Sequence, residues 1–254
     1  MMNRLFPLLL ATPLLAQNPK PSFDSLAKLD LPGVKINLEK KSVDVTAAVS
    51  LREGSLEFIA CTPNSKEHES IVVVKAKPSH IHTALLLLRA KPGHPAIRKM
   101  VGDADNPRWI DLPPQGSPVT VSFVVPGKNG KPVELPISDF VARIDYDSDP
   151  KEAEIEGSAK RLQHFVFAGS HLYGKDGEPK TYLADTSGSV ISLSTFGDEL
   201  LCLPEVYANE NQALQWEVNP KHLPEIGTEI TLRLTPTPVK EEESEESPSP
   251  GADN

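Results

Sequence analysis

The sequence predicts a single α+β domain that is rich in sheet, contains one buried helix and ends in a disordered acidic tail. Three observations predict this fold class: short apolar stretches with the alternation of strands, one stretch with helical spacing, and 25 prolines spread through 254 residues. Proline removes a backbone N–H and disrupts a helix interior, so this many prolines favour strands and loops. With 39% apolar residues, the chain can bury a substantial core.

The N-terminus has the pattern of a secretory signal peptide. Arg4 gives it a positive start, and residues 5–16 form an apolar run that ends in the small residue Ala16. This run is too short to cross about 30 Å of hydrocarbon, which argues against a membrane anchor. We therefore expect residues 1–16 to be removed, and the mature protein to be periplasmic or secreted, with no membrane span.

Two further segments flank the predicted globular domain, which covers residues 34–236. Residues 17–33 are expected to be a flexible lead-in, because prolines interrupt them. Residues 237–254 are rich in glutamate and almost free of apolar side chains, so that burial cannot offset the entropy of ordering them. We expect a disordered acidic tail that keeps the protein soluble, and the alternative is an arm that binds a partner.

Strands account for most of the predicted domain. Residues 43–51 alternate apolar and polar side chains, as a half-buried strand does, and residues 56–61 form a second strand. Residues 71–74 are all β-branched or apolar and should be buried on both faces. We expect the connection at residues 62–70 to make the second and third strands a hairpin with a long loop.

One helix is predicted after these strands. Ser79 is a suitable N-cap, and residues 91–93 (Lys-Pro-Gly) should end the helix. Leu86 and Leu87 extend its apolar surface, so we expect the helix to be largely buried. Its apolar stripe at helical spacing consists of Ile81, Ala84, Leu85 and Leu88.

Later segments return to strand patterns, with a hairpin around residues 127–130 and a turn at residues 174–177. The strands expected here are residues 119–125, 165–168, 181–184, 190–196 and 229–234. We expect the aromatic side chains of this part of the chain to pack in the core rather than form a carbohydrate platform. These are Trp109, Phe165, Phe167, Tyr173, Tyr182 and Trp216.

Several of these segments resemble the YdjY-domain family of bacterial envelope proteins. The distinctive part is the string Lys-Glu-His-Glu-Ser at residues 66–70, which follows Leu-Arg-Glu-Gly-Ser-Leu-Glu-Phe-Ile-Ala-Cys at residues 51–61. Further similar segments are residues 76–86, 91–93, 165–170, 182–185 and 190–194. The resemblance covers residues 34 to 234; it implies one secreted domain and supplies no reaction.

The two cysteines, Cys61 and Cys202, leave three interpretations open. In an oxidising compartment an even count invites a disulfide, which here would be a local feature because the family pattern does not require a cysteine at position 202. Two buried free thiols are the second interpretation. The third is a catalytic thiol at Cys61, whose pKa Lys66 or His68 would have to lower across the predicted hairpin loop.

The string at residues 66–70 is the most unusual stretch of the sequence. It places the carboxylates of Glu67 and Glu69 beside the imidazole of His68. Such a histidine can act as a general base or a ligand. The interpretation that we favour is structural: these side chains, with Lys66, satisfy backbone groups of the loop and form ion pairs.

A group of histidines in the same region suggests a metal site. Zinc requires three or four ligands around one ion. On the predicted helix His80 and His82 lie on opposite faces, so they cannot bind one ion together. One of them could join His68 and Glu69, although the usual spacing of a closed zinc site is missing. The histidines concerned are His68, His80, His82 and His94.

Composition and missing motifs narrow the function further. A net charge of −9 argues against general binding to nucleic acids, and no phosphate-binding glycine loop, nucleophile elbow or dinucleotide fingerprint is present, so we expect no cofactor. We favour a non-catalytic binding or structural module of the cell envelope, with an envelope component or a small ligand as partner. The alternative is a metal- or thiol-dependent site that includes Cys61, His68, Glu69 and a histidine from positions 80 and 82.

Overall fold

The computed structural model describes residues 30–103, 106–127, 129–144, 162, 164–207 and 215–237. The chain divides into two units at Asp30, and every described residue after Asp30 belongs to the second unit. The predicted signal peptide and most of the predicted lead-in lie outside the described residues, as does the predicted tail beyond Thr237.

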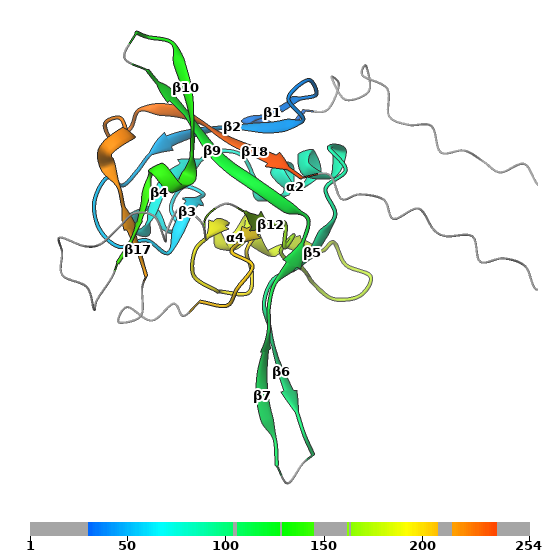
Figure 1. The fold of residues 1–254 in the computed structure, drawn as a ribbon. Helices are drawn as coiled ribbons and strands as arrows, with labels where there is room; N and C mark the ends of the chain where they lie inside the picture. Colours follow the sequence, from blue (N-terminus) through cyan, green and yellow to red (C-terminus); the bar gives the residue numbers. More distant parts are fainter. Residues whose placement is uncertain are drawn as a thin grey trace, which may run out of the picture. The chain divides into compact units, whose positions relative to one another are not determined.

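Ten strands of the second unit form one sheet, and eight of them close into a barrel (Figure 1). Closure occurs where β2 pairs antiparallel with β4, through Ala47–Val74 and Val49–Val72. In sheet order the barrel strands are β2 (Ser42–Val49), β18 (Glu229–Pro236), β9 (Pro118–Pro126), β12 (Phe165–Val166), β16 (Leu201–Cys202), β15 (Ser189–Ser192), β3 (Phe58–Cys61) and β4 (Ser70–Val74). Two more strands, β1 (Val34–Asn37) and β10 (Pro132–Pro136), pair with β2 and β9.

Short elements connect and cover these strands. The helices are α2 (Pro78–Leu87), α4 (Leu183–Ser187) and the 3₁₀ turns η1 (Glu67–Glu69), η2 (Ile137–Asp139) and η3 (Pro220–His222). Four two-stranded sheets complete the described fold: β5 (Pro92–His94) with β8 (Gln115–Gly116), β6 (Ile97–Val101) with β7 (Arg108–Leu112), β11 (Val141–Arg143) with β17 (Trp216–Val218), and β13 (Leu172–Tyr173) with β14 (Thr181–Tyr182). The fold is therefore sheet-rich with few helices, as predicted, but its closure into a barrel was not predicted.

The predicted hairpin at residues 62–70 is wrong. Strands β3 and β4 run parallel, with Phe58 paired to Ser70 and Ala60 to Val72. The connection folds into η1 and carries the chain back to the end at which β3 began. Strand β3 spans only about 13 Å at 3.3 Å per residue, so a short connection can return the chain to its start. Loop length alone did not distinguish this crossover from a hairpin.

The predicted helix is confirmed as α2, with a different start and end. Its N-cap is Lys77 and Pro78 occupies the first turn, so Ser79 lies inside the helix. The helix stops at Leu88, before the expected Lys-Pro-Gly signal. Leu86 is 44% exposed, which shows that only one face of the helix is buried and corrects the expectation of a largely buried helix.

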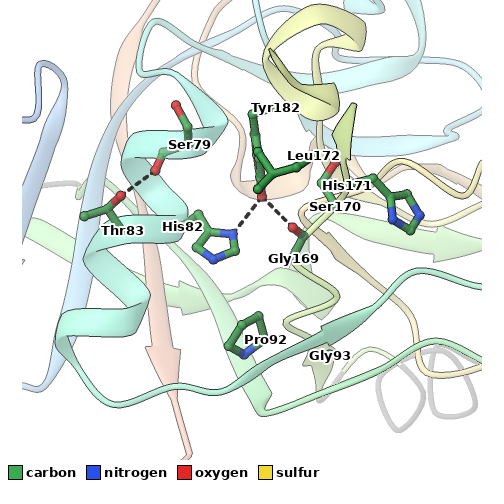
Figure 2. A pocket seen from close by; sticks show the side chains of 10 residues that line it. All are labelled: Ser79, His82, Thr83, Pro92, Gly93, Gly169, Ser170, His171, Leu172 and Tyr182. Carbon is green, nitrogen blue, oxygen red and sulfur yellow. Dashed lines mark hydrogen bonds between the residues drawn. The ribbon is translucent and has the colours of Figure 1, made fainter. Parts of the chain in front are cut away.

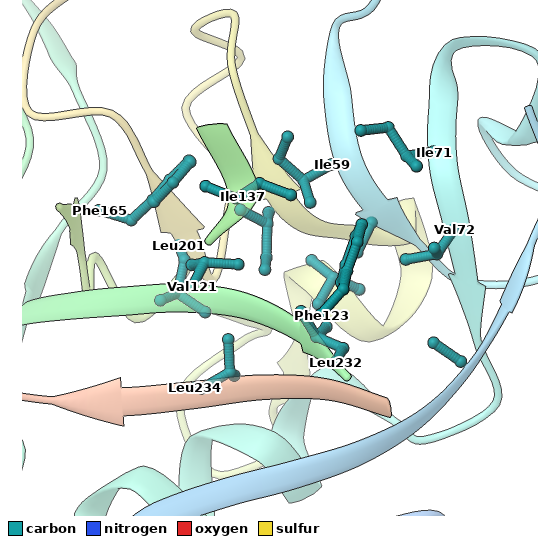
Figure 3. Packing of buried hydrophobic residues seen from close by; sticks show 14 of the residues in the cluster. Ile59, Ile71, Val72, Val121, Phe123, Ile137, Phe165, Leu201, Leu232 and Leu234 are labelled. Carbon is teal, nitrogen blue, oxygen red and sulfur yellow. The ribbon is translucent and has the colours of Figure 1, made fainter. Parts of the chain in front are cut away.

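The core fills the interior of the barrel (Figure 3). Side chains on the inner face come from strands far apart in the sequence, among them Val72 of β4, Phe123 of β9 and Leu232 of β18, all fully buried. Burial of such side chains contributes about 1.5–3 kcal/mol each to folding. An eight-stranded barrel is just wide enough for side chains to fill it.

The aromatic residues divide between the core and the surface. Phe165, Phe167 and Trp216 are buried, as predicted. Trp109 and Tyr173, by contrast, are 64% and 74% exposed, so that prediction was wrong for them. Both lie on two-stranded hairpins that are not extended by a further strand among the described residues. A strand pattern alone does not reveal whether the strand joins the main sheet.

An ion-pair network on the outer face ties four strands together. Arg233 of β18 lies between the inward-facing Leu232 and Leu234 and is itself 8% exposed. Its guanidinium donates two hydrogen bonds of 2.7 Å to the carboxylate of Asp44 on β2 and another to Glu134 on β10. Ser122 of β9 donates to the second oxygen of Glu134. The network therefore fixes the register of neighbouring strands as well as pairing charges.

Replacing Arg233 with Met should lower the free energy of unfolding by about 2–4 kcal/mol, because the Asp44 carboxylate, only 16% exposed, loses its partner. Glu134 is 43% exposed and can recover hydration, which limits the loss. The control is Arg98→Met, whose exposed pair with Asp111 contributes less than about 1 kcal/mol. Urea denaturation of both variants measures the difference, and equal stabilities would contradict the structural role of the network.

Candidate functional site

A pocket of about 440 Å³ opens beside α2 (Figure 2). Helix α2, strand β5, strand β14 and the segment at residues 169–172 build its walls. It is lined by Ser79, His82, Thr83, Pro92, Gly93, Gly169, Ser170, His171, Leu172 and Tyr182. A volume of this size suits a small molecule rather than a folded partner.

Helix α4 holds α2 in place at one side of the pocket. Asp185 of α4 accepts hydrogen bonds from the backbone N–H of Ser79, at 2.8 Å, and from its hydroxyl, at 2.7 Å. The carboxylate thus satisfies one of the free N–H groups of the first turn of α2. Tyr182 directly precedes α4 and is its N-cap. His82 on α2 and Tyr182 before α4, the two polar side chains at the centre of the pocket, are therefore fixed relative to each other.

His82 and Tyr182 form the polar centre of the pocket (Figure 2). The Tyr182 hydroxyl donates to the carbonyl oxygen of Gly169 at 2.8 Å. The hydroxyl oxygen of Tyr182 also lies 2.8 Å from Nδ1 of His82. Since the single hydroxyl proton is used at Gly169, the proton of the second bond belongs to Nδ1, and Tyr182 accepts it. The network thereby assigns a lone pair to Nε2, which points away from Tyr182 on the side of Pro92.

Burial keeps both of these groups uncharged. The pKa of His82 is lowered by desolvation, so the imidazole is neutral at neutral pH. Its ring packs edge-on against Phe167 at a centroid distance of 4.7 Å. Desolvation also raises the pKa of the Tyr182 hydroxyl, with a further contribution from the charge of Asp185. The pocket thus presents a neutral ring nitrogen with a fixed orientation.

Ser170, another lining residue, is engaged in structure. Its hydroxyl donates to the carbonyl of Asp198 at 2.6 Å and accepts from the backbone N–H of Ala184 at 3.1 Å. The residue has a left-handed φ of 51°, which positions this hydroxyl between two chain segments. With its proton already donated, Ser170 lacks the arrangement of a catalytic serine beside a base.

The predicted polar cluster at residues 66–69 lies elsewhere, at η1. Lys66 Nζ donates to the carbonyl of Ser187 at 2.9 Å and to the hydroxyl of Ser189 at 3.0 Å, and it lies 5.0 Å above the ring of Phe58. Glu67 accepts hydrogen bonds from the backbone N–H groups of Asn64 and Ser65. Its pKa is lowered by a hydrogen bond to its own backbone N–H and, to a smaller extent, by these two. These contacts are the structural roles that we favoured for Lys66 and Glu67.

The histidines of the cluster are separated in the structure. His68 has a side chain that is 78% exposed, and its Nε2 lies 3.7 Å from Glu69. His80 is on α2 with a buried Nδ1 that has no hydrogen-bond partner, and His82 lines the pocket. Among the described residues no group of three or more histidine, cysteine, aspartate or glutamate side chains is arranged to hold a metal ion.

Both cysteines are free and buried. Desolvation raises the pKa of Cys61 and of Cys202, which is the opposite of what a nucleophilic thiol requires. In the sheet, Cys61 of β3 lies opposite Ser189 of β15, and Cys202 of β16 lies opposite Ser192 of β15. Strand β15 therefore separates the strands that carry the two cysteines. Two strand spacings amount to about 9.6 Å. This exceeds the Cα separation of about 7 Å that a disulfide spans without backbone movement.

Glu57, which no sequence pattern singled out, lies beside Glu69. Glu57 directly precedes β3 and Glu69 directly precedes β4, next to the first pair of these parallel strands, Phe58 with Ser70. The backbone N–H of Glu57 donates to the carbonyl of Glu69 at 3.2 Å. Their carboxyl groups are therefore neighbours. Desolvation and the charge of Glu69 raise the pKa of Glu57 to about 7, against the smaller opposing effects of His68 and Lys66. Only the parallel register reveals this pair.

Comparisons with known proteins are consistent with the resemblance in the sequence. The family model described as the YdjY domain matches residues 34–235. No curated protein and no solved structure matches the chain. Among the described helices, none is long and apolar enough to cross a membrane.

The Glu57–Glu69 pair predicts a stability that falls as the pH rises. Between pH 4.5, the ordinary pKa of glutamate, and about pH 7, folded Glu57 retains a proton that the unfolded chain has lost. The contribution of Glu57 to stability is therefore fully present below this interval and is lost above it. Glu57→Gln, which cannot ionise, should be more stable than the wild type at pH 8 by about 1–3 kcal/mol and nearly equal at pH 4.5.

Urea denaturation between pH 4.5 and 8 measures this difference. The matched control is Glu217→Gln, at an exposed position of β17, which should follow the wild-type pH profile. Parallel profiles for the wild type and Glu57→Gln would show that the carboxyl pair does not share a proton.

Proposed function

The chain belongs to the YdjY domain family, and from this premise we propose that it is a non-catalytic binding module of the cell envelope whose pocket beside α2 holds a small ligand. The observation that carries the proposal is the fixed orientation of His82. Its ring lines a pocket of about 440 Å³, and its Nδ1 is held by the Tyr182 hydroxyl, which is itself bonded to the carbonyl oxygen of Gly169. Convergent polar groups in an otherwise apolar pocket are typical of a binding site.

The state of the neighbouring groups favours binding over catalysis. Covalent catalysis needs a nucleophile that a base can deprotonate. In the pocket the hydroxyl protons of Ser170 and Tyr182 are donated to carbonyl oxygens, and burial keeps Tyr182 protonated. A thiol-dependent site is disfavoured because Cys61 is buried at the barrel wall and does not line the pocket.

The sequence of residues 1–16 supports export as the second part of the proposal. The full chain, produced in a bacterial host with two membranes, should be recovered from the periplasm or the medium. Its first residue should then be Gln17, as read by N-terminal sequencing or intact mass. A cytoplasmic protein that retains Met1 or Met2 would contradict export.

Filling the pocket should abolish binding. A set of small water-soluble amines, carboxylates and sugars is tested against the mature protein by saturation-transfer NMR. Compounds that bind the wild type should lose their signal with Thr83→Trp, because the indole occupies the pocket. They should keep it with Leu86→Trp, which adds the same side chain to the exposed face of the same helix. Binding that is insensitive to Thr83→Trp, or no binding at all, would contradict the proposed function.

A further inference from the structure

We infer that the ligand of this pocket is a primary ammonium group with a short apolar tail, an inference that rests on the proposed function. Each polar side chain that lines a pocket can offer a proton, a lone pair or both. A pocket whose protons are all used internally offers only lone pairs, and it therefore selects a ligand that donates.

The hydroxyl groups of the pocket have already donated their protons inside the protein. Ser79 donates to Asp185 at 2.7 Å, and Thr83 donates to the carbonyl of Ser79 at 2.8 Å. Tyr182 and Ser170 donate to the carbonyl oxygens of Gly169 and Asp198. None of these hydroxyl groups has a proton left for a ligand, whereas their oxygen atoms retain acceptor capacity.

His82 completes the same pattern. Its one proton is on Nδ1 and is donated to Tyr182, so Nε2 is an acceptor. A carboxylate or phosphate ligand would face this lone pair without a hydrogen bond. An ammonium group has three donors and no acceptor, and it matches a set of lone pairs.

Charge and apolar surface agree with a cation that carries a tail. No lysine or arginine lines the pocket, and the carboxylate of Asp185, which lies outside the lining, offsets the partial positive charge of the N-terminal end of α2 at Ser79. His171, the second histidine that lines the pocket, keeps an N–H donor, but its side chain is exposed and that donor can bond to water instead of a ligand. Pro92 and Leu172 supply apolar surface, which suits a short hydrocarbon chain.

Three probes with the same four-carbon tail test the inference. The mature protein is titrated with n-butylammonium chloride, sodium butyrate and 1-butanol, and binding is followed by the backbone amide shifts of pocket residues. Butylammonium should bind most tightly, butanol more weakly, and butyrate should not bind. His82→Phe keeps a ring but removes the acceptor, and it should weaken butylammonium binding by about 10- to 150-fold, the effect of one hydrogen bond to a charged group. His68→Phe, at an exposed site outside the pocket, should leave the affinity unchanged.

The tautomer of His82 supplies an independent readout. In the wild type the ¹⁵N shifts should show a protonated Nδ1 and an unprotonated Nε2. Tyr182→Phe removes the acceptor of the Nδ1 proton, so that Nε2-protonated imidazole should appear and butylammonium binding should weaken. Persistence of the wild-type tautomer and affinity in Tyr182→Phe would overturn the inference.

The outcomes separate the two proposals. Butyrate or butanol that binds more tightly than butylammonium, in a manner sensitive to Thr83→Trp, would overturn the ammonium inference and leave the binding function intact. If none of the three probes and no member of the compound set responds to Thr83→Trp, both proposals fail.

Discussion

The parallel, in-register pairing of β3 with β4 is the constraint on which the rest of the structure depends. It lets β4 meet β2, so that the barrel closes. It also forces residues 62–69 to carry the chain back to the end at which β3 began, and within this segment Lys66 reaches Ser187 and Ser189. The same register places Glu57 beside Glu69, a repulsive arrangement that the fold tolerates because one of the two carboxyl groups holds a proton up to about pH 7.

Helix α4 connects the returning segment to the pocket. Its last carbonyl group, at Ser187, accepts from Lys66, its Asp185 holds the first turn of α2, and the Tyr182 that caps it orients His82. Gly188 ends α4 with a left-handed φ of 79°, and a Cβ atom there would lie 2.4 Å from the Ser65 hydroxyl. The loop that carries the Lys-Glu-His-Glu-Ser string therefore acts as a support for the element that orders the pocket.

The sequence predicted what depends on local pattern. Strands such as β2 and β18 were found because their side chains alternate, and α2 was found from its apolar stripe. The closure of the barrel, the parallel run of β3 and β4, and the Glu57–Glu69 pair depend on which strands become neighbours. Contacts between residues far apart in the sequence leave no periodic signal. The pocket was missed for the same reason, since His82 and Tyr182 lie 100 residues apart.

The contrast between His68 and His82 shows why proximity in the sequence was a poor guide to chemistry. His68 stands among carboxylates, yet its side chain is 78% exposed and water screens its interaction with Glu69. His82 has no charged neighbour in the sequence, but burial, the ring of Phe167 and a hydroxyl partner fix its orientation and tautomer. A group whose proton positions are fixed before the ligand arrives incurs no ordering cost on binding and rejects a ligand of the wrong hydrogen-bonding type more strongly. Of the two histidines, only His82 has its ring orientation and its proton position fixed by the structure.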